Sequence, residues 1–210
     1  MRHSVRKRSI DAPTATPTDR RYVLIGGPGV GKTMLLKHLG EAGYPTVGEA
    51  ARDIIDEQLR LGTDVLPWRD QTAFQRSVLT LQLERERMSE GPIVFMDRGV
   101  PDGIAYLRVR GLGVFRELLQ HARGRYAMAF LLEPLDLYGT DPVRRENPEA
   151  AARLHLAIEA AYRDLGYEVV KVPAMPVERR TSFVIEHLAL SAGKPRVATP
   201  SGPYLPPSKE

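Results

Sequence analysis

The chain has 210 residues, 42% of them hydrophobic, which is enough apolar material for one domain with a proper core. It contains no cysteine, so disulfide bonds and thiolate metal sites are excluded, and a cytoplasmic location is expected. No apolar run approaches the roughly 18 residues of a membrane span, so no membrane association is expected.

The formal net charge of +4 belongs to the two ends of the chain. Residues 1–20 contribute +3 and residues 192–210 contribute +2, which leaves −1 for residues 21–191. Both ends are poor in apolar residues and contain several prolines, and we predict a disordered basic leader (1–20) and a disordered Pro-rich tail (192–210) around one folded domain (21–191). Because this domain has no basic excess, we expect no nucleic-acid partner, whereas a protein partner could bind the tails.

Short apolar segments alternate with segments of helical spacing along the predicted domain. Helices between short apolar strands predict an α/β fold whose parallel sheet is covered on both faces. The expected strands are 21–25, 44–47, 93–96, 126–132 and 167–172, and the expected helices are 32–42, 49–61, 68–90, 103–111, 113–123, 147–165 and 177–190.

Residues 26–33 read GGPGVGKT, a complete G-x-x-x-x-G-K-[ST] phosphate-binding loop between an expected strand and an expected helix. The glycines let successive backbone N–H groups point into one cavity, and the helix N-terminus adds its own N–H groups and dipole. Lys32 is expected to bind the outer phosphates and Thr33 to ligate Mg²⁺. A glycine-rich turn that binds nothing is the alternative, but it needs neither Lys nor Thr at these positions. The expected nucleotide-binding residues are Gly27, Pro28, Gly29, Val30, Gly31, Lys32 and Thr33.

A charged segment, DRGVPD at 97–102, follows the expected strand 93–96. Ligands bind at the carboxyl ends of the strands in an open parallel sheet. Asp97 is therefore a candidate to hold Mg²⁺ or its water, and Arg98 to face phosphate or substrate. A helix cap and a surface ion pair are the alternatives for these two residues. Asp102 is a candidate to accept hydrogen bonds from the acceptor, although Pro-Asp-Gly is also a common turn sequence.

Glu49 follows the second expected strand and is the candidate general base, because a carboxylate there lies across the cleft from the phosphates. Favourable charge at a helix N-terminus is its alternative role. Arg52 is expected to bind substrate or to pair with Glu49. Trp68 is a candidate for the wall of the substrate pocket or for packing over a helix start. The histidines show no metal-ligand spacing and are interpreted as surface or packing residues.

The segment YGTDPVRREN at 138–147 precedes an expected helix. Its Gly and Pro predict a mobile lid. Arg144 or Arg145 is expected to close over the phosphates, because arginine spreads positive charge over a transferring phosphoryl group. A solvated loop is the alternative.

These motifs resemble a family of predicted P-loop ATPases and kinases, which are AAA-type ATP-binding proteins. That family is similar to the ribosylnicotinamide-kinase domain of NAD-biosynthesis regulators and, more distantly, to nucleoside and nucleotide kinases. The resemblance implies a three-layer NMP-kinase-like fold with a five-stranded parallel sheet, an arginine-bearing lid near Arg144, and an acceptor cleft near Glu49 and Asp97. Relatives tend to carry a tryptophan after the fourth strand, where this chain reads LEPLDLY at 132–138. The resemblance is carried by GGPGVGKT (26–33), GYPTVGEAARDII (43–55), LPW (66–68), VFMDRGVPDGIAYL (94–107), residues 141–145 and LGYEVVKVP (165–173).

The sequence therefore predicts a magnesium-dependent kinase that moves the γ-phosphoryl group of ATP to a hydroxyl of a nucleoside-like or other small molecule. A regulatory ATPase or GTPase that signals to a protein partner is the alternative, although no guanine-reading Asn-Lys-x-Asp motif is present. A nucleic-acid-end kinase is a third hypothesis, which the neutral domain disfavours. The expected catalytic residues are Lys32, Glu49, Asp97, Arg98, Arg144 and Arg145, the metal ligands Thr33 and Asp97, and the substrate-binding residues Glu49, Arg52, Trp68, Arg98 and Asp102.

Overall fold

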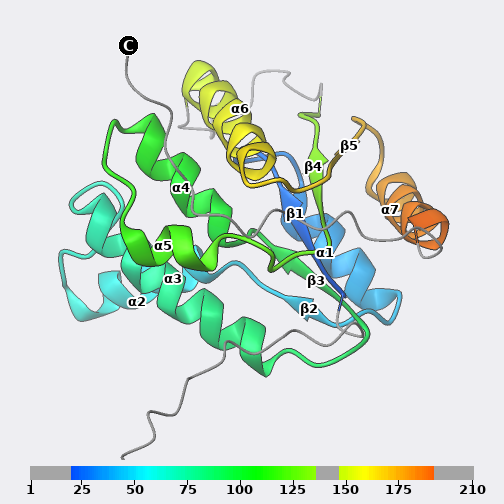
Figure 1. Ribbon diagram of the computed structural model, residues 1–210, viewed down its shortest axis with the longest axis horizontal. Helices are drawn as coiled ribbons and strands as arrows, with labels where there is room; N and C mark the ends of the chain where they lie inside the picture. Colours follow the sequence, from blue (N-terminus) through cyan, green and yellow to red (C-terminus); the bar gives the residue numbers. More distant parts are fainter. Residues whose placement is uncertain (1–19, 136–146, 192–210) are drawn as a thin grey trace, which may run out of the picture.

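The computed structural model describes residues 20–135 and 147–191. Its centre is a sheet of five parallel strands in the order β2-β3-β1-β4-β5, with helices on both faces (Figure 1). The predicted fold class is confirmed. The elements are β1 (Arg20–Ile25), α1 (Lys32–Glu41), β2 (Thr46–Val47), α2 (Ala50–Leu61), α3 (Gln71–Met88), β3 (Ile93–Asp97), α4 (Val100–Val109), α5 (Arg116–His121), β4 (Met128–Leu132), α6 (Pro148–Asp164), β5 (Val169–Val172) and α7 (Val177–Ser191).

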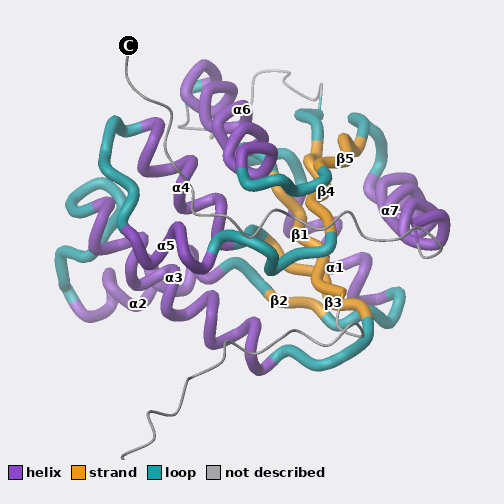
Figure 2. Tube along the Cα trace, in the orientation of Figure 1, coloured by secondary structure: helices purple, strands orange, loops and turns teal. Residues whose placement is uncertain are grey.

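The central strand β1 lies between layers of helices (Figure 2), and its alternate residues pack into two different cores. Val23 and Ile25 pack into a core with residues of α3, α4, α5 and α6. Tyr22 and Leu24 pack into a second core with residues of α1 and α7. Because successive side chains of a strand point to opposite faces, a strand that is apolar throughout can fill both cores. The result is the predicted arrangement of three layers.

Capping residues set the ends of several helices. The side chain of Asp70 accepts a hydrogen bond from the N–H of Ala73 at the start of α3. Asn147 does the same for Glu149 at the start of α6. Gly62 adopts the left-handed conformation directly after α2 and ends that helix.

The start of α4 corrects the sequence prediction. The helix begins at Val100 rather than Gly103, so Pro101 and Asp102 lie in its first turn. The Asp102 carboxylate accepts a hydrogen bond from the N–H of Gly99 (3.0 Å) and so caps the helix. Proline is favourable in a first turn, where its missing N–H costs nothing. The interpretation of Pro-Asp-Gly as a turn is therefore wrong.

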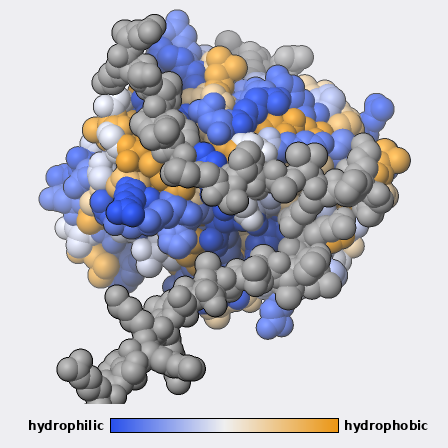
Figure 3. Space-filling view, in the orientation of Figure 1, coloured by the Kyte–Doolittle hydropathy of each residue, from blue (hydrophilic) through white to orange (hydrophobic). Residues whose placement is uncertain are grey.

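The strand ends differ slightly from the prediction: β1 begins at Arg20, one residue before the predicted domain boundary, and β3 ends one residue later, at Asp97. The strands β2, β4 and β5 each begin two residues later than predicted. The rest of the predicted leader, the predicted tail and the predicted lid with Arg144 and Arg145 lie outside the described residues. None of the helices in the described part of the chain combines the length and apolar character that a membrane span requires. On the face shown in Figure 3, hydrophobic groups lie between hydrophilic ones where the described residues are visible.

Candidate active site

The phosphate loop, residues 26–33, joins β1 to α1 at the carboxyl end of the sheet. The Nζ atom of Lys32 donates hydrogen bonds to the carbonyl oxygens of Gly26 (3.1 Å) and Gly27 (2.8 Å), and the residue is only 6% exposed. Burial and then the nearby Arg98 guanidinium lower the pKa of Lys32 to about 8, against the opposing effect of neighbouring carboxylates. The loop thus holds an ammonium group where such loops bind the outer phosphates.

Thr33 and Asp97 meet beside the loop. Thr33 Oγ1 donates a hydrogen bond to Asp97 Oδ2 (2.8 Å). Asp97 is 1% exposed, and its Oδ1 has no hydrogen-bond partner among the described residues. Burial raises the pKa of Asp97, whereas the Thr33 hydroxyl and the Lys32 charge lower it. A hydroxyl and a carboxylate with an unused oxygen suit Mg²⁺, which takes its other ligands from phosphate and water. The residues present therefore fit the predicted metal.

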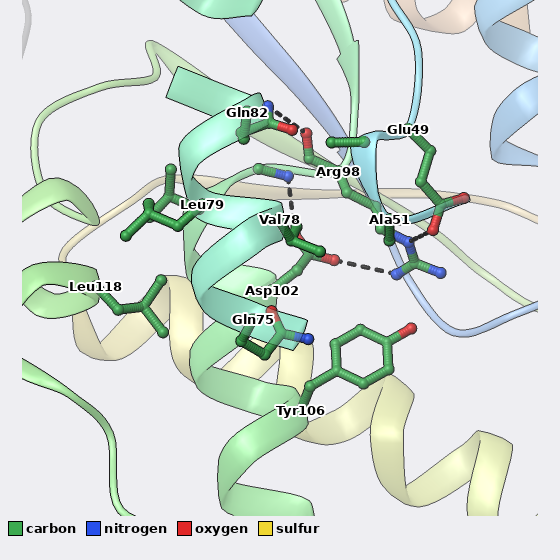
Figure 4. A pocket seen from close by; sticks show the side chains of 14 residues that line it. Glu49, Ala51, Gln75, Val78, Leu79, Gln82, Arg98, Asp102, Tyr106 and Leu118 are labelled. Carbon is green, nitrogen blue, oxygen red and sulfur yellow. Dashed lines mark hydrogen bonds and ion pairs between the residues drawn. The ribbon is translucent and has the colours of Figure 1, made fainter. Parts of the chain in front are cut away.

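Arg98 lies next to Asp97 and extends its guanidinium between two carboxylates. Its Nε donates to Glu49 Oε1 (2.7 Å), and one terminal nitrogen, Nη1, donates to Asp102 Oδ1 (3.2 Å) (Figure 4). Burial by itself lowers the pKa of Arg98. The neighbouring Tyr106, Glu49 and Asp102 raise it by a larger amount, so the pKa of Arg98 is raised overall. The backbone φ of 68° is in the left-handed region, which non-glycine residues rarely adopt. Backbone strain is thus located where the chain directs a permanent cation into the cleft.

Two buried tyrosines form a layer behind Arg98. The hydroxyl of Tyr162 donates to Asp102 Oδ2 (2.7 Å), and the hydroxyl of Tyr126 accepts a hydrogen bond from the N–H of Val100 (2.8 Å). A Cβ atom at Gly99 would lie 2.7 Å from atoms of both tyrosines, so only glycine fits there. Burial raises the pKa of both tyrosines, which keeps their hydroxyls protonated. These two tyrosines therefore orient Asp102 and the turn before α4.

Glu86 of α3 lies below this layer and is almost completely buried. It accepts hydrogen bonds from the Tyr126 hydroxyl (2.6 Å) and from Gln82 (3.0 Å), and it forms an ion pair with Arg125 (2.6 Å). These contacts connect α3 with the segment before β4 and, through Tyr126, with the start of α4. The turn that carries Arg98 is thus supported from outside the cleft.

Two cavities meet at these residues. The larger one, which we call the cleft, has a volume of about 710 Å³ and is lined by the phosphate loop and by residues of α2 and α4. The smaller one, the inner pocket, has a volume of about 30 Å³ and extends between α2, α3 and α4. Glu49, Arg98 and Tyr106 line both, so the inner pocket opens from the same space as the cleft.

Most predicted substrate-binding residues come together here. Glu49 and Arg98 line both cavities, Asp102 lines the inner pocket, and Arg52 lines the cleft. Glu49 pairs with Arg98, and no ion pair joins it to Arg52 within residues 20–135 and 147–191. The roles assigned to these residues remain predictions.

The role of Trp68 in substrate binding stays a prediction. Trp68 is 57% exposed and lines neither of the two cavities. In the turn that contains it, Leu66 takes the buried position and Asp70 caps α3, which leaves Trp68 on the solvent side. The packing of this short turn decides which of its residues is buried, and the sequence of the turn alone does not determine that packing.

Sequence reasoning missed two residues that hold the phosphate loop from behind. His155 Nδ1 accepts a hydrogen bond from the N–H of Gly27 (3.2 Å). The Arg180 guanidinium is 2% exposed and donates to the carbonyl oxygens of Val30 (2.6 Å), Glu133 (2.7 Å) and Pro173 (3.1 Å). Burial lowers the pKa of His155 and of Arg180. The nearby Glu133 carboxylate raises both pKa values, but by less than burial lowers them.

A signal for both residues existed in their helices. Arg180 shares one face of α7 with the buried Val184 and Leu188, and His155 shares one face of α6 with the buried Ile158. A polar residue on an apolar helix face must find a buried partner. The partners, 128 and 150 residues away in the chain, could not be named from spacing.

The comparisons with known proteins agree with this geometry. A sequence model of an AAA domain matches residues 21–180. The chain belongs to this AAA domain family. No curated protein matches its sequence.

Among solved structures, this AAA domain protein is similar to thymidylate kinase from Candida albicans, with 14% identity, a TM-score of 0.59, and coverage of 83% of this chain and 93% of that one. It is also similar to NadR in complex with NR (17%, TM-score 0.63), for which the match covers 86% of this chain but only 54% of NadR. Shikimate kinase from Acinetobacter baumannii, solved with shikimate, gives 18% identity, a TM-score of 0.52, and coverage of 84% of this chain and 96% of that one. These likenesses show a P-loop kinase fold.

Proposed function

We propose that the protein is an ATP-dependent kinase that transfers the γ-phosphoryl group to a hydroxyl of a small molecule. The observation that carries the proposal is that one cleft is lined by Lys32 and Thr33 of the phosphate loop and by Glu49 and Arg98. The kinase fold of the neighbouring structures supports it. A cleft that holds both phosphate-binding groups and a carboxylate has what transfer between two substrates requires.

On the donor side, the backbone N–H groups of the phosphate loop would hold the outer phosphates, and Lys32 would place positive charge against them. Thr33 Oγ1 and Asp97 Oδ1 would hold Mg²⁺, which supplies further neutralisation of phosphate charge when bound. Asp97 and Thr33 already contact each other, so little rearrangement of these side chains is needed.

On the acceptor side, Glu49 would take the proton from the attacking hydroxyl. Its Oε1 is fixed by Arg98, whereas its Oε2 has no hydrogen-bond partner among the described residues. The free oxygen can therefore receive a proton while the other oxygen keeps the carboxylate oriented. Arg98, charged at every accessible pH, would stabilise negative charge that develops between the two substrates.

The proposal is tested with purified protein, ATP, Mg²⁺ and a pool of nucleosides and other hydroxylated metabolites. ADP release and new phosphomonoesters are followed by mass spectrometry. We expect ADP release that depends on an acceptor, together with one dominant phosphorylated product. ADP release that is equal with and without acceptors would replace the kinase by a regulatory nucleotide hydrolase.

The Glu49→Gln variant tests the role of the base. The glutamine keeps an oxygen for Arg98 but cannot take a proton, so turnover should fall by about 100-fold or more while the Kd for ATP stays unchanged. Glu57→Gln, an exposed position on the same helix, serves as the matched control and should behave as the wild type. Loss of ATP binding in Glu49→Gln would instead assign Glu49 to the donor site.

A further inference from the structure

The peptide group between Gly26 and Gly27, at the start of the phosphate loop, is held from both sides. Its carbonyl oxygen, which belongs to Gly26, accepts a hydrogen bond from Lys32 Nζ (3.1 Å). Its N–H, which belongs to Gly27, donates to His155 Nδ1 of α6 (3.2 Å). The carbonyl and the N–H of a planar trans peptide point in opposite directions, so a partner that fixes one also fixes the other. His155 therefore sets the direction of a carbonyl oxygen that holds the Lys32 ammonium group.

This peptide group depends on its hydrogen bonds for its orientation. It lies between two glycines, and Gly26 has a φ of 132°, in a region that glycine reaches without strain. Without Cβ atoms on either side, rotation of the peptide plane meets little steric resistance. A Cβ atom at Gly27 would lie 3.1 Å from the carbonyl oxygen of Ala151 and 3.4 Å from His155 Cβ, so α6 packs directly against the loop. The histidine is thus close enough to act on the loop backbone.

Only the neutral ring of His155 can accept this hydrogen bond. When Nδ1 accepts, the hydrogen of the ring is on Nε2, which lies 4.0 Å from Glu133 Oε2. The Glu133 carboxylate, which also pairs with Lys171 (3.3 Å), therefore faces the ring nitrogen that carries the hydrogen. A protonated ring has a second N–H at Nδ1, and two donors would then face each other. Protonation would remove the support of the peptide group.

The surroundings of His155 favour the neutral ring near neutral pH. The residue is 7% exposed, and burial has the largest effect on its pKa, which it lowers. Lys171 of β5 and Lys32 of α1 lower it further, whereas Glu133, directly after β4, and Glu159 of α6 raise it without reversing the decrease. The ring therefore becomes charged only below the ordinary histidine pKa of about 6.5.

From these contacts we infer that His155 is a positioning residue of the nucleotide site. Its neutral ring fixes the first peptide group of the loop so that the Gly26 carbonyl oxygen keeps the Lys32 ammonium at the place of the outer phosphates. Protonation of Nδ1 releases this peptide group and weakens ATP binding. The inference rests on the nucleotide site of the proposed function and requires nothing of the acceptor.

The main test compares His155→Asn with His155→Leu, two side chains of the same shape. Asparagine can place an oxygen where Nδ1 lies and takes up no proton, whereas leucine offers no acceptor. The Kd for ATP with Mg²⁺ is measured by calorimetry on the full chain at about pH 7.5, where a histidine is neutral. His155→Asn should bind ATP as the wild type does, and His155→Leu should bind about tenfold more weakly, as for one lost hydrogen bond. Lys32 keeps its contact with the Gly27 carbonyl oxygen (2.8 Å), so binding is weakened rather than abolished.

Thermal unfolding separates positioning from packing. Leucine has the higher helix propensity and suits a buried position better, so His155→Leu should have the higher Tm of the two variants. His121→Asn, at the exposed end of α5, is the control for the substitution itself and should change neither quantity. If His155→Leu bound ATP as tightly as His155→Asn, His155 would only pack, and the inference would be overturned.

A pH series tests the protonation step. The ratio of the wild-type Kd to the His155→Asn Kd cancels the ionisation of ATP, Lys32 and Asp97, because all three are present in both measurements. The affinity should be complete above the pKa of His155 and fall as the pH drops through it, so the ratio should rise from one to about tenfold as the ring is protonated. Nitrogen NMR shifts of His155 report that protonation. A ratio that stays at one after the ring is protonated overturns the inference and leaves the proposed function standing, whereas a wild-type protein that binds no ATP at any pH overturns both.

Discussion

The donor side and the acceptor side of the cleft hold their groups by different means. The donor side comes from one continuous stretch, residues 26–33, and relies on backbone groups and Lys32. The acceptor side brings Glu49 together with Arg98 and Asp102, which come from a second place in the chain, and these residues hold one another by ion pairs. A site made of main chain tolerates side-chain changes outside it, whereas a site made of mutually paired side chains depends on every member.

The two sides also differ in what supports them. The phosphate loop is held by two residues of the C-terminal helices, His155 and Arg180, which contact backbone atoms of the loop. The acceptor side is held by Tyr162 and, through Tyr126, by Glu86, which contact side chains and the turn before α4. Substitutions in the two supports should therefore affect different substrates, and the following predictions test this difference.

The largest effect is expected for Lys32→Ala. Removal of the ammonium group should lower kcat by about 1,000-fold, because a preorganised charge at a transferring phosphoryl group is lost. Lys37→Ala, an exposed position in the same helix, is the control and should leave kcat unchanged. Steady-state kinetics with a saturating acceptor make the measurement, and a Lys32→Ala enzyme with near-normal turnover would refute the assignment of the loop.

Asp102→Ala should destabilise the protein by about 3 kcal/mol, because the buried Arg98 and the Tyr162 hydroxyl lose a shared partner. The matched control is Asp164→Ala, which breaks a surface pair with Arg108 and should cost less than about 1 kcal/mol. Urea unfolding gives both values. If the two variants lost equal stability, the acceptor side would not depend on its ion pairs.

Arg180→Met should destabilise the protein by about 2 kcal/mol, because three carbonyl oxygens, one in a buried and two in partly buried contacts, lose their donor. It should also weaken ATP binding and leave the KM for the acceptor unchanged, which distinguishes the donor support from the acceptor support. Arg179→Met, on the exposed side of α7, is the control. An increase in acceptor KM with unaltered ATP binding would contradict the proposed separation.

The smallest effect is a dependence of ATP binding on pH. The pKa of Lys32 is lowered to about 8, and a bound polyphosphate favours the protonated form. Binding should therefore take up a proton above pH 8, and the affinity should fall by up to about tenfold for each further pH unit. Below that pKa the lysine is already charged, and its protonation no longer changes the affinity. Calorimetry in buffers of different ionisation enthalpy measures the uptake, and Lys32→Arg, which stays charged, should show neither effect.

The structure agrees with the sequence where the signal is local. The phosphate loop and the apolar strands can be read from neighbouring residues. The predicted start of α6 at Asn147 is right to within one residue, whereas the helix predicted from Trp68 begins only at Gln71, after the cap Asp70. The start of α4 was misplaced although its signal is also local: Asp102 caps the helix through the N–H of Gly99, and Pro101 fits the first turn.

The amino-acid sequence by itself determined the α/β fold, the nucleotide loop and the charged strand ends. The signals for them are the spacing of apolar residues, helix capping and the GGPGVGKT motif, and each of these signals lies within a short stretch of the chain. Only the tertiary structure decided that Arg98 pairs with Glu49 and Asp102, that Gln75 faces the inner pocket, and that Arg180 supports the loop. Apart from the pair of Arg98 and Asp102, which are four residues apart, these contacts join residues that lie far apart in the chain, and side chains buried without a partner are costly. The packing of helices on the sheet chooses the partners, and this choice places Arg98 between Glu49 and Asp102.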